Sequence, residues 1–152
     1  MILSTHFITG TAVASCTDSP LLVVVLPLVL HFILDMIPHW EYVNDTSELK
    51  NRIPSIAIDA LAGPIAILAV LLLVFGVNYG MIIWLFVGGT ISVIPDGLSL
   101  LHVLLPKNKL LKQIFAFHET IHNKKMLVRK IGFPLQIAID LLAIILIILP
   151  KA

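Results

Sequence analysis

The motif His118-Glu119-Thr120-Ile121-His122 has residue types that could bind a metal and activate water. In this H-E-x-x-H spacing, the two histidines lie one helical turn apart and can bind zinc. The glutamate can accept a proton from a metal-bound water. We therefore predict His118 and His122 as metal ligands and Glu119 as the catalytic general base. The alternative is a membrane-surface helix whose histidines and lysines contact lipid headgroups.

A second pattern of histidine and carboxylate lies between residues 31 and 39. His31 and Asp35 are four residues apart, so they share one face of a helix. His39 continues the row beyond Pro38, where the helix is expected to end. Imidazole and carboxylate groups on adjacent turns can bind one metal ion. We predict all three as ligands, with a structural His31–Asp35 hydrogen bond as the alternative.

Four further polar residues interrupt apolar segments. Asp96 lies between Ile94-Pro95 and Gly97, where a helix break would place its carboxylate on irregular backbone. We predict Asp96 as a ligand, or as part of a simple turn. His6 is predicted either as a ligand or as a packing residue beside Gly10. Asp59 and His102 are predicted to orient the ligands by hydrogen bonds.

The composition predicts the setting of these residues. The chain has 152 residues, of which 59% are apolar and 12% charged, and its mean hydropathy is +1.04. Soluble domains carry roughly 25% charged residues. We therefore expect one all-α integral membrane domain whose partner is the lipid bilayer, with no nucleic acid. Cys16 is a single cysteine, so it cannot form an intrachain disulfide. The oligomeric state is not predicted.

Five hydrophobic segments are expected to form a polytopic helix bundle. They cover about residues 2–15, 20–37, 54–76, 79–105 and 131–149. A break is expected inside the third segment at Gly63-Pro64 and inside the fourth at Pro95. Between the fourth and fifth segments, residues 107–127 are basic and amphipathic, which predicts a helix in the membrane interface.

The basic residues predict the orientation of the bundle. Seven of the ten lysines and arginines lie between Pro106 and Ile131: Lys107, Lys109, Lys112, Lys124, Lys125, Arg129 and Lys130. Such a stretch stays in the cytoplasm. We therefore expect residues 107–130 and the N-terminus to be cytoplasmic. This topology gathers the predicted metal ligands at the cytoplasmic membrane boundary.

Three stretches resemble a known family at these residues. They are THFITGTA with its His-x3-Gly, HFILDMIPHW, and IPDG. Together they are similar to the small prokaryotic inner-membrane proteins known as membrane-bound metal-dependent hydrolases. The resemblance implies a multi-helix bundle in the inner membrane with a His/Asp metal site. By matching motif positions, it assigns metal binding to His6, His31, Asp35 and Asp96, together with His118 and His122. In this chain Gly97 follows Asp96, where the family has a second aspartate and a histidine.

These observations predict a membrane-embedded hydrolase with a metal-bound water as nucleophile. We expect a divalent metal, zinc first, with manganese or iron as alternatives. The basic residues near the site suit an anionic amphiphile or phosphoester as substrate. Two other functions are compatible with the sequence. One is a membrane protein that binds or conducts a cation or protons. The other is a structural subunit whose polar residues hold the helices together.

Overall fold

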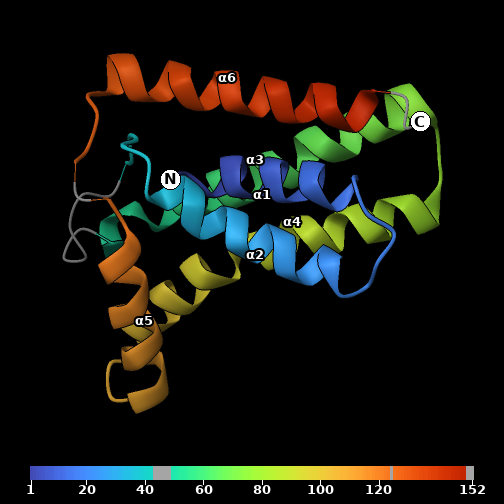
Figure 1. The fold of residues 1–152 in the computed structure, drawn as a ribbon. Coiled ribbons are helices and arrows are strands. Elements are labelled where there is room, and N and C mark those ends of the chain that lie inside the picture. Colours follow the sequence, from blue (N-terminus) through green and yellow to red (C-terminus); the bar gives the residue numbers. More distant parts are fainter. Residues whose placement is uncertain (43–48, 124, 150–152) are drawn as a thin grey trace.

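The described part of the chain is entirely helical. The computed structural model describes residues 1–42, 49–123 and 125–149, which form six α-helices and no β-strand. The expected all-α fold is therefore confirmed for these residues. Lys124, part of the basic segment, lies outside the described residues. The helices, arranged as Figure 1 shows, are α1 (Leu3–Ala14), α2 (Leu22–Asp35), α3 (Leu49–Phe75), α4 (Tyr79–Leu104), α5 (Lys109–Ile121) and α6 (Arg129–Ile148).

Three of the helices are long and apolar enough to cross a membrane. They are α3 from Asn51, α4 and α6, with mean hydropathies of 2.5, 1.7 and 2.5. By contrast, α1 has 12 residues and α2 has 14. At about 1.5 Å per residue both are shorter than the roughly 30 Å of a bilayer's hydrocarbon core. Of the five expected hydrophobic segments, three form helices of spanning length and two form shorter helices.

The distribution of polar and apolar side chains suits a lipid environment. Large apolar residues such as Leu73, Ile58 and Leu142 lie on the outer surface of α3 and α6, with 87%, 71% and 67% of their area exposed. Buried positions, in contrast, include many polar side chains, among them His6, His31 and Asp35. Exposed apolar surface on this scale would be unfavourable in water. In a bilayer it faces lipid, and the polar groups face one another.

The short helix α1 forms the centre of the bundle. It contacts α2, α3, α4 and α6, and Figure 1 shows it between α6 and α2. Ten of its 12 residues are buried. The hydroxyl groups of Thr9 and Thr11 donate to Thr5 O and Phe7 O in the same helix, at 2.7 and 2.8 Å. Because other helices surround α1, its length need not match the thickness of the membrane.

Small residues bring α1 and α4 into close contact. A Cβ atom added at Gly88 would lie 2.3 Å from the Cβ of Ala14, and one added at Gly10 would lie 2.4 Å from the Cβ of Ser92. Membrane helices commonly approach one another through such small residues. This contact places His6 of α1 near Asp96 of α4, with 3.8 Å between Nε2 and Oδ2.

The expected helix breaks do not occur. Helix α4 continues through Pro95 and Gly97, and α3 continues through Pro54 and Pro64. A proline removes one backbone donor from a helix. Unwinding the helix would leave several more backbone groups unpaired, which is costly in an apolar environment. Asp96 therefore lies on a helix and not on irregular backbone, which corrects the prediction for IPDG.

We predict that Gly88→Ala destabilises the fold, while Gly97→Ala on the same helix does not. The Gly88 methyl would overlap α1, and such overpacking costs about 1–3 kcal/mol. Nothing lies within 4 Å of a Cβ atom at Gly97, so alanine there should stabilise the helix by about 0.5–1 kcal/mol. Thermal unfolding in detergent, followed by circular dichroism, measures both. Equal melting temperatures for the two variants would contradict the α1–α4 contact.

Candidate metal centre

Three helices bring four predicted ligands together. His31 and Asp35 come from α2, Asp96 from α4 and His118 from α5, and each offers one ligand atom within 4.8 Å of the others. Asp35 Oδ2 lies 2.9 Å from His118 Nε2 and 3.2 Å from His31 Nε2. The distance from His118 Nε2 to Asp96 Oδ1 is 3.7 Å. We call these four residues the first ligand group.

A second ligand group shares Asp35 with the first. It contains Asp35, His39 and His122, whose ligand atoms also lie within 4.8 Å of one another. His122 Nε2 lies 4.0 Å from Asp35 Oδ1. The rings of His39 and His122 pack edge to face, with their centroids 4.9 Å apart. Both groups lie beside the N-terminus, because the Met1 nitrogen is 2.8 Å from the Asp35 carboxylate that they share. Figure 1 shows the N-terminus and α5 at the same end of the bundle.

The H-E-x-x-H motif does not form one helical site. Helix α5 ends at Ile121, and His122 follows in extended conformation with φ −60° and ψ 129°. His118 therefore joins the first ligand group, whereas His122 joins the second. The prediction that both histidines lie on one helical turn is wrong, because the helix ends between them.

Backbone hydrogen bonds hold His122 beside His39. Asn123 N donates to Asp35 O and Leu127 N donates to His39 O, each at 2.8 Å. The side-chain amide of Asn123 also donates to Met36 O at 2.8 Å. The chain after α5 thus runs along the chain after α2. These bonds hold His39 and His122 of the second ligand group together, although the two residues are distant in the sequence.

Glu41 contacts two histidines of the second ligand group and was not among the residues predicted from the sequence. Its Oε1 atom lies within hydrogen-bonding distance of His39 Nε2, at 2.7 Å, and of His122 Nε2, at 2.9 Å. Burial alone would raise the pKa of Glu41, but the bonds from His122 and His39 hold this pKa well below its usual range. The hydrogen bond to Glu41 in turn raises the pKa of His122, against the effect of burial. The spacing His39-x-Glu41 was the available sequence signal.

A hydrogen bond from α4 sets the tautomer of His118. The Ser99 hydroxyl donates to Pro95 O at 3.0 Å, so its oxygen is left to accept from His118 Nδ1 at 2.9 Å. With the proton on Nδ1, the lone pair of His118 Nε2 points toward Asp35 and Asp96. Metal-binding histidines are oriented in this way by a partner on the second ring nitrogen.

The remaining predicted site residues lie around the ligand groups. His6 is fully buried, with Nε2 3.0 Å from Asp35 Oδ1. Asp59 accepts from Leu3 N and the Tyr42 hydroxyl at 2.6 and 3.1 Å, so it holds the start of α1 and contacts none of the described ligands.

His102 also lies outside both ligand groups, and it packs against Phe115 with ring centroids 5.0 Å apart. This contact holds α5 against α4. Glu119 is exposed and forms no hydrogen bond or ion pair with the described residues. It lines the same cavity as His118 and His122.

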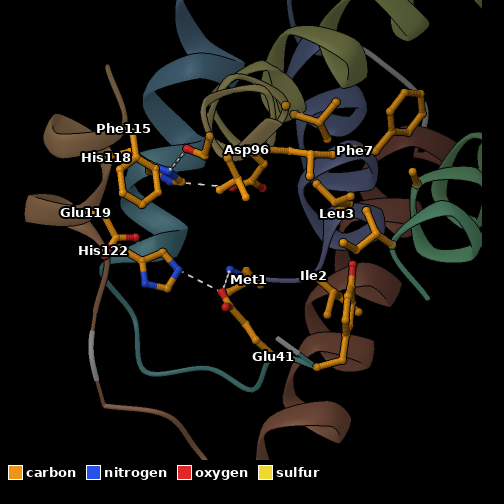
Figure 2. Close-up of a pocket in the computed structure, with 18 of the residues that line it drawn as sticks. Met1, Ile2, Leu3, Phe7, Glu41, Asp96, Phe115, His118, Glu119 and His122 are labelled. Atoms are coloured by element: carbon orange, nitrogen blue, oxygen red, sulfur yellow. Dashed lines mark hydrogen bonds and ion pairs between the residues drawn. The ribbon is translucent and has the colours of Figure 1, made fainter. Parts of the chain in front are cut away.

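The ligand groups border a cavity of about 710 Å³. Figure 2 shows His118 and His122 of the α5 region on one side of it, with Asp96, Met1 and Glu41 facing them. The Met1 α-ammonium donates to Asp35 Oδ1 at 2.8 Å and to Glu41 Oε1 at 2.7 Å. The rest of the lining is largely apolar, including Phe7, Ile56, Ala60, Val93, Leu100, Val103 and Phe115.

The chain matches no protein-family model, no curated protein and no solved structure.

The side chains of the two ligand groups fit a divalent cation. Buried carboxylates require a positive partner, and the imidazole lone pairs converge on the same space. Asp96 Oδ2 is buried and has no hydrogen-bond partner, so it is available to a ligand. The donor set of imidazole nitrogen and carboxylate oxygen suits zinc, iron and manganese. The part of the chain that the structure describes therefore contains a buried cluster able to hold a metal ion.

We predict that Ser99→Ala weakens metal affinity by about 10- to 100-fold, which is typical of residues that orient a ligand histidine. The change removes the acceptor for His118 Nδ1. Thr120→Ala is the control, because that hydroxyl donates to Phe117 O of its own helix. Competition with a fluorescent chelator measures the affinity of the purified proteins. Equal affinities would show that Ser99 does not orient His118 for metal binding.

Proposed function

We propose that this protein is a membrane-embedded, metal-dependent hydrolase whose site opens at the cytoplasmic side of the inner membrane. The observation that carries the proposal is the meeting of two His/carboxylate ligand groups at Asp35, on the wall of a large cavity. A metal bound there would polarise the scissile group and lower the pKa of a bound water, which becomes the nucleophile. The resemblance to membrane-bound metal-dependent hydrolases supports the same activity.

Glu119 is the proposed general base. It follows His118 directly and lines the cavity, so it can reach a water held near the ligand groups after a change of side-chain rotamer. Unlike Glu41, it has no hydrogen bond to a histidine among the described residues. Its carboxylate is therefore available to accept a proton. Glu41 is already engaged by His39 and His122, which suits a ligand more than a base.

The proposed substrate is an amphiphile with a polar, anionic headgroup, such as a phosphoester. The polar lining residues Asp96, His118 and His122 face one another in one part of the cavity, where the bond to be cleaved would lie. The apolar lining from α1, α3 and α4 suits a hydrocarbon chain. Exposed lysines on and after α5, including Lys109, Lys112 and Lys125, would attract an anionic headgroup or an anionic leaflet.

The proposed membrane arrangement keeps the basic residues in the cytoplasm. Helices α3, α4 and α6 would span the bilayer, and α1 and α2 would complete the bundle as shorter elements. Helix α5 projects away from the bundle (Figure 1) and carries exposed Leu110 and Phe117. It would lie in the cytoplasmic interface with these side chains among lipid tails. The N-terminus lies at the same end of the bundle as α5.

A cation-conducting or proton-conducting role has less support. Such a path needs polar groups that remain available across the whole bundle. Deeper in α1, the hydroxyl groups of Thr9 and Thr11 already donate to carbonyls of the same helix. The titratable side chains of both ligand groups lie together beside the N-terminus. This distribution favours a localised site over a continuous path.

The first test of the function uses Glu119→Gln. We expect this variant to retain its metal and lose about 100- to 10,000-fold in hydrolysis rate, the usual contribution of a general base. Hydrolysis is measured on chromogenic phosphomonoesters, phosphodiesters and carboxylic esters, and metal content by elemental mass spectrometry. Loss of metal would identify Glu119 as a ligand. Unchanged activity together with unchanged metal content would assign the base to another residue.

The second test addresses the alkyl chain of the substrate. Ala60→Trp should fill part of the apolar lining and reduce turnover of long-chain substrates at least tenfold, while short-chain analogues are hydrolysed at the wild-type rate. Ala57→Trp, one turn earlier on α3, is the control because Ala57 is exposed and does not line the cavity. A series of esters of increasing chain length provides the measurement. Equal losses for short and long chains would contradict chain binding in this cavity.

A further inference from the structure

The two oxygens of Asp35 face different ligand groups. Oδ2 lies 2.9 Å from His118 Nε2 and 3.2 Å from His31 Nε2. Oδ1 lies 2.8 Å from the Met1 nitrogen, 3.0 Å from His6 Nε2 and 4.0 Å from His122 Nε2. A carboxylate whose oxygens point into two sets of imidazoles can bind two cations at once. In two-metal sites such bridged ions lie about 3.5–4 Å apart.

We propose that the site holds two divalent metal ions bridged by Asp35. The first ion would bind His31, Asp96 and His118, and the second would bind His39, His122 and Glu41. This inference extends the proposed metal centre and rests on it, but it does not depend on hydrolysis. Glu41 is the new ligand, contributed by the loop after α2.

The buried carboxylates make the second ligand group a favourable position for a cation. Asp35, Asp96 and Glu41 bring three carboxylates into one partly enclosed region, where buried charges are stable when paired. The Met1 α-ammonium lies between Asp35 and Glu41, 2.8 and 2.7 Å from their oxygens. A second metal ion would take the position of this ammonium group.

The hydrogen bonds of His39 lead to the same conclusion. Its Nδ1 lies 2.7 Å from Ile37 O, and its Nε2 lies 2.7 Å from Glu41 Oε1. A carbonyl and a carboxylate are both acceptors. If Nδ1 donates to Ile37 O, Nε2 can act as a ligand beside Glu41. Its lone pair is then oriented toward a cation bound there.

The experiment measures metal number and coupling in the purified chain. The protein is loaded with Mn²⁺ in detergent, its metal content is counted by elemental mass spectrometry, and its electron paramagnetic resonance spectrum is recorded. We expect two ions per chain and the multiline spectrum of a coupled pair. One ion per chain, or two ions with uncoupled spectra, would overturn the bridged centre.

Variants assign the ions to their ligands. Glu41→Gln and His39→Ala should each reduce the content from two ions to one and replace the coupled spectrum by that of an isolated ion. His102→Ala removes a histidine outside both ligand groups and should keep both ions. Size-exclusion chromatography confirms that each variant is folded and monodisperse. Retention of both coupled ions in Glu41→Gln would exclude Glu41 as a ligand.

The outcomes separate this inference from the proposed hydrolase. A single ion with measurable hydrolysis would reject the second ion and leave the hydrolase in place. Two coupled ions without hydrolysis of any tested ester or phosphoester would support the bridged centre and reject the hydrolase. Absence of stoichiometric metal in the wild-type protein would reject both.

Discussion

The buried carboxylate of Asp35 is the group on which the arrangement of this protein depends. It is fully buried and contacts histidines from α1, α2 and α5 together with the chain's α-ammonium. An isolated carboxylate in an apolar environment is strongly unfavourable. Each of these contacts therefore has to be maintained, and Asp35 fixes the relative positions of elements that are distant in sequence.

The bundle around Asp35 is organised to supply those contacts. Helix α1 is too short to span a bilayer, yet it occupies the centre because α2, α3, α4 and α6 cover it. Glycines at its contact with α4 bring the two backbones close together. Asp59 holds its first residues. As a result, the beginning of the chain lies beside the site, and His6 faces Asp35.

The exposed surface and the site follow from one physical constraint. In lipid, apolar side chains are favourable outside and polar groups must find partners inside. The described helices show this distribution, with leucine and isoleucine outside and the His/carboxylate groups gathered at one end. The cavity next to these groups is lined by both polar and apolar side chains.

The sequence by itself determined the helical class, the apolar helices and most of the residues that meet in the ligand groups. Apolar runs and the spacing of His31 and Asp35 depend on local periodicity, which can be read without a structure. Tertiary structure decided what local spacing cannot specify. Helix α5 ends before His122, so the two histidines of one motif serve different groups, and α4 remains continuous at Pro95. Glu41 joins its histidines because backbone hydrogen bonds align the chain after α5 with the chain after α2. These outcomes depend on contacts between segments that are distant in the sequence, and such contacts cannot be predicted from any single stretch of it.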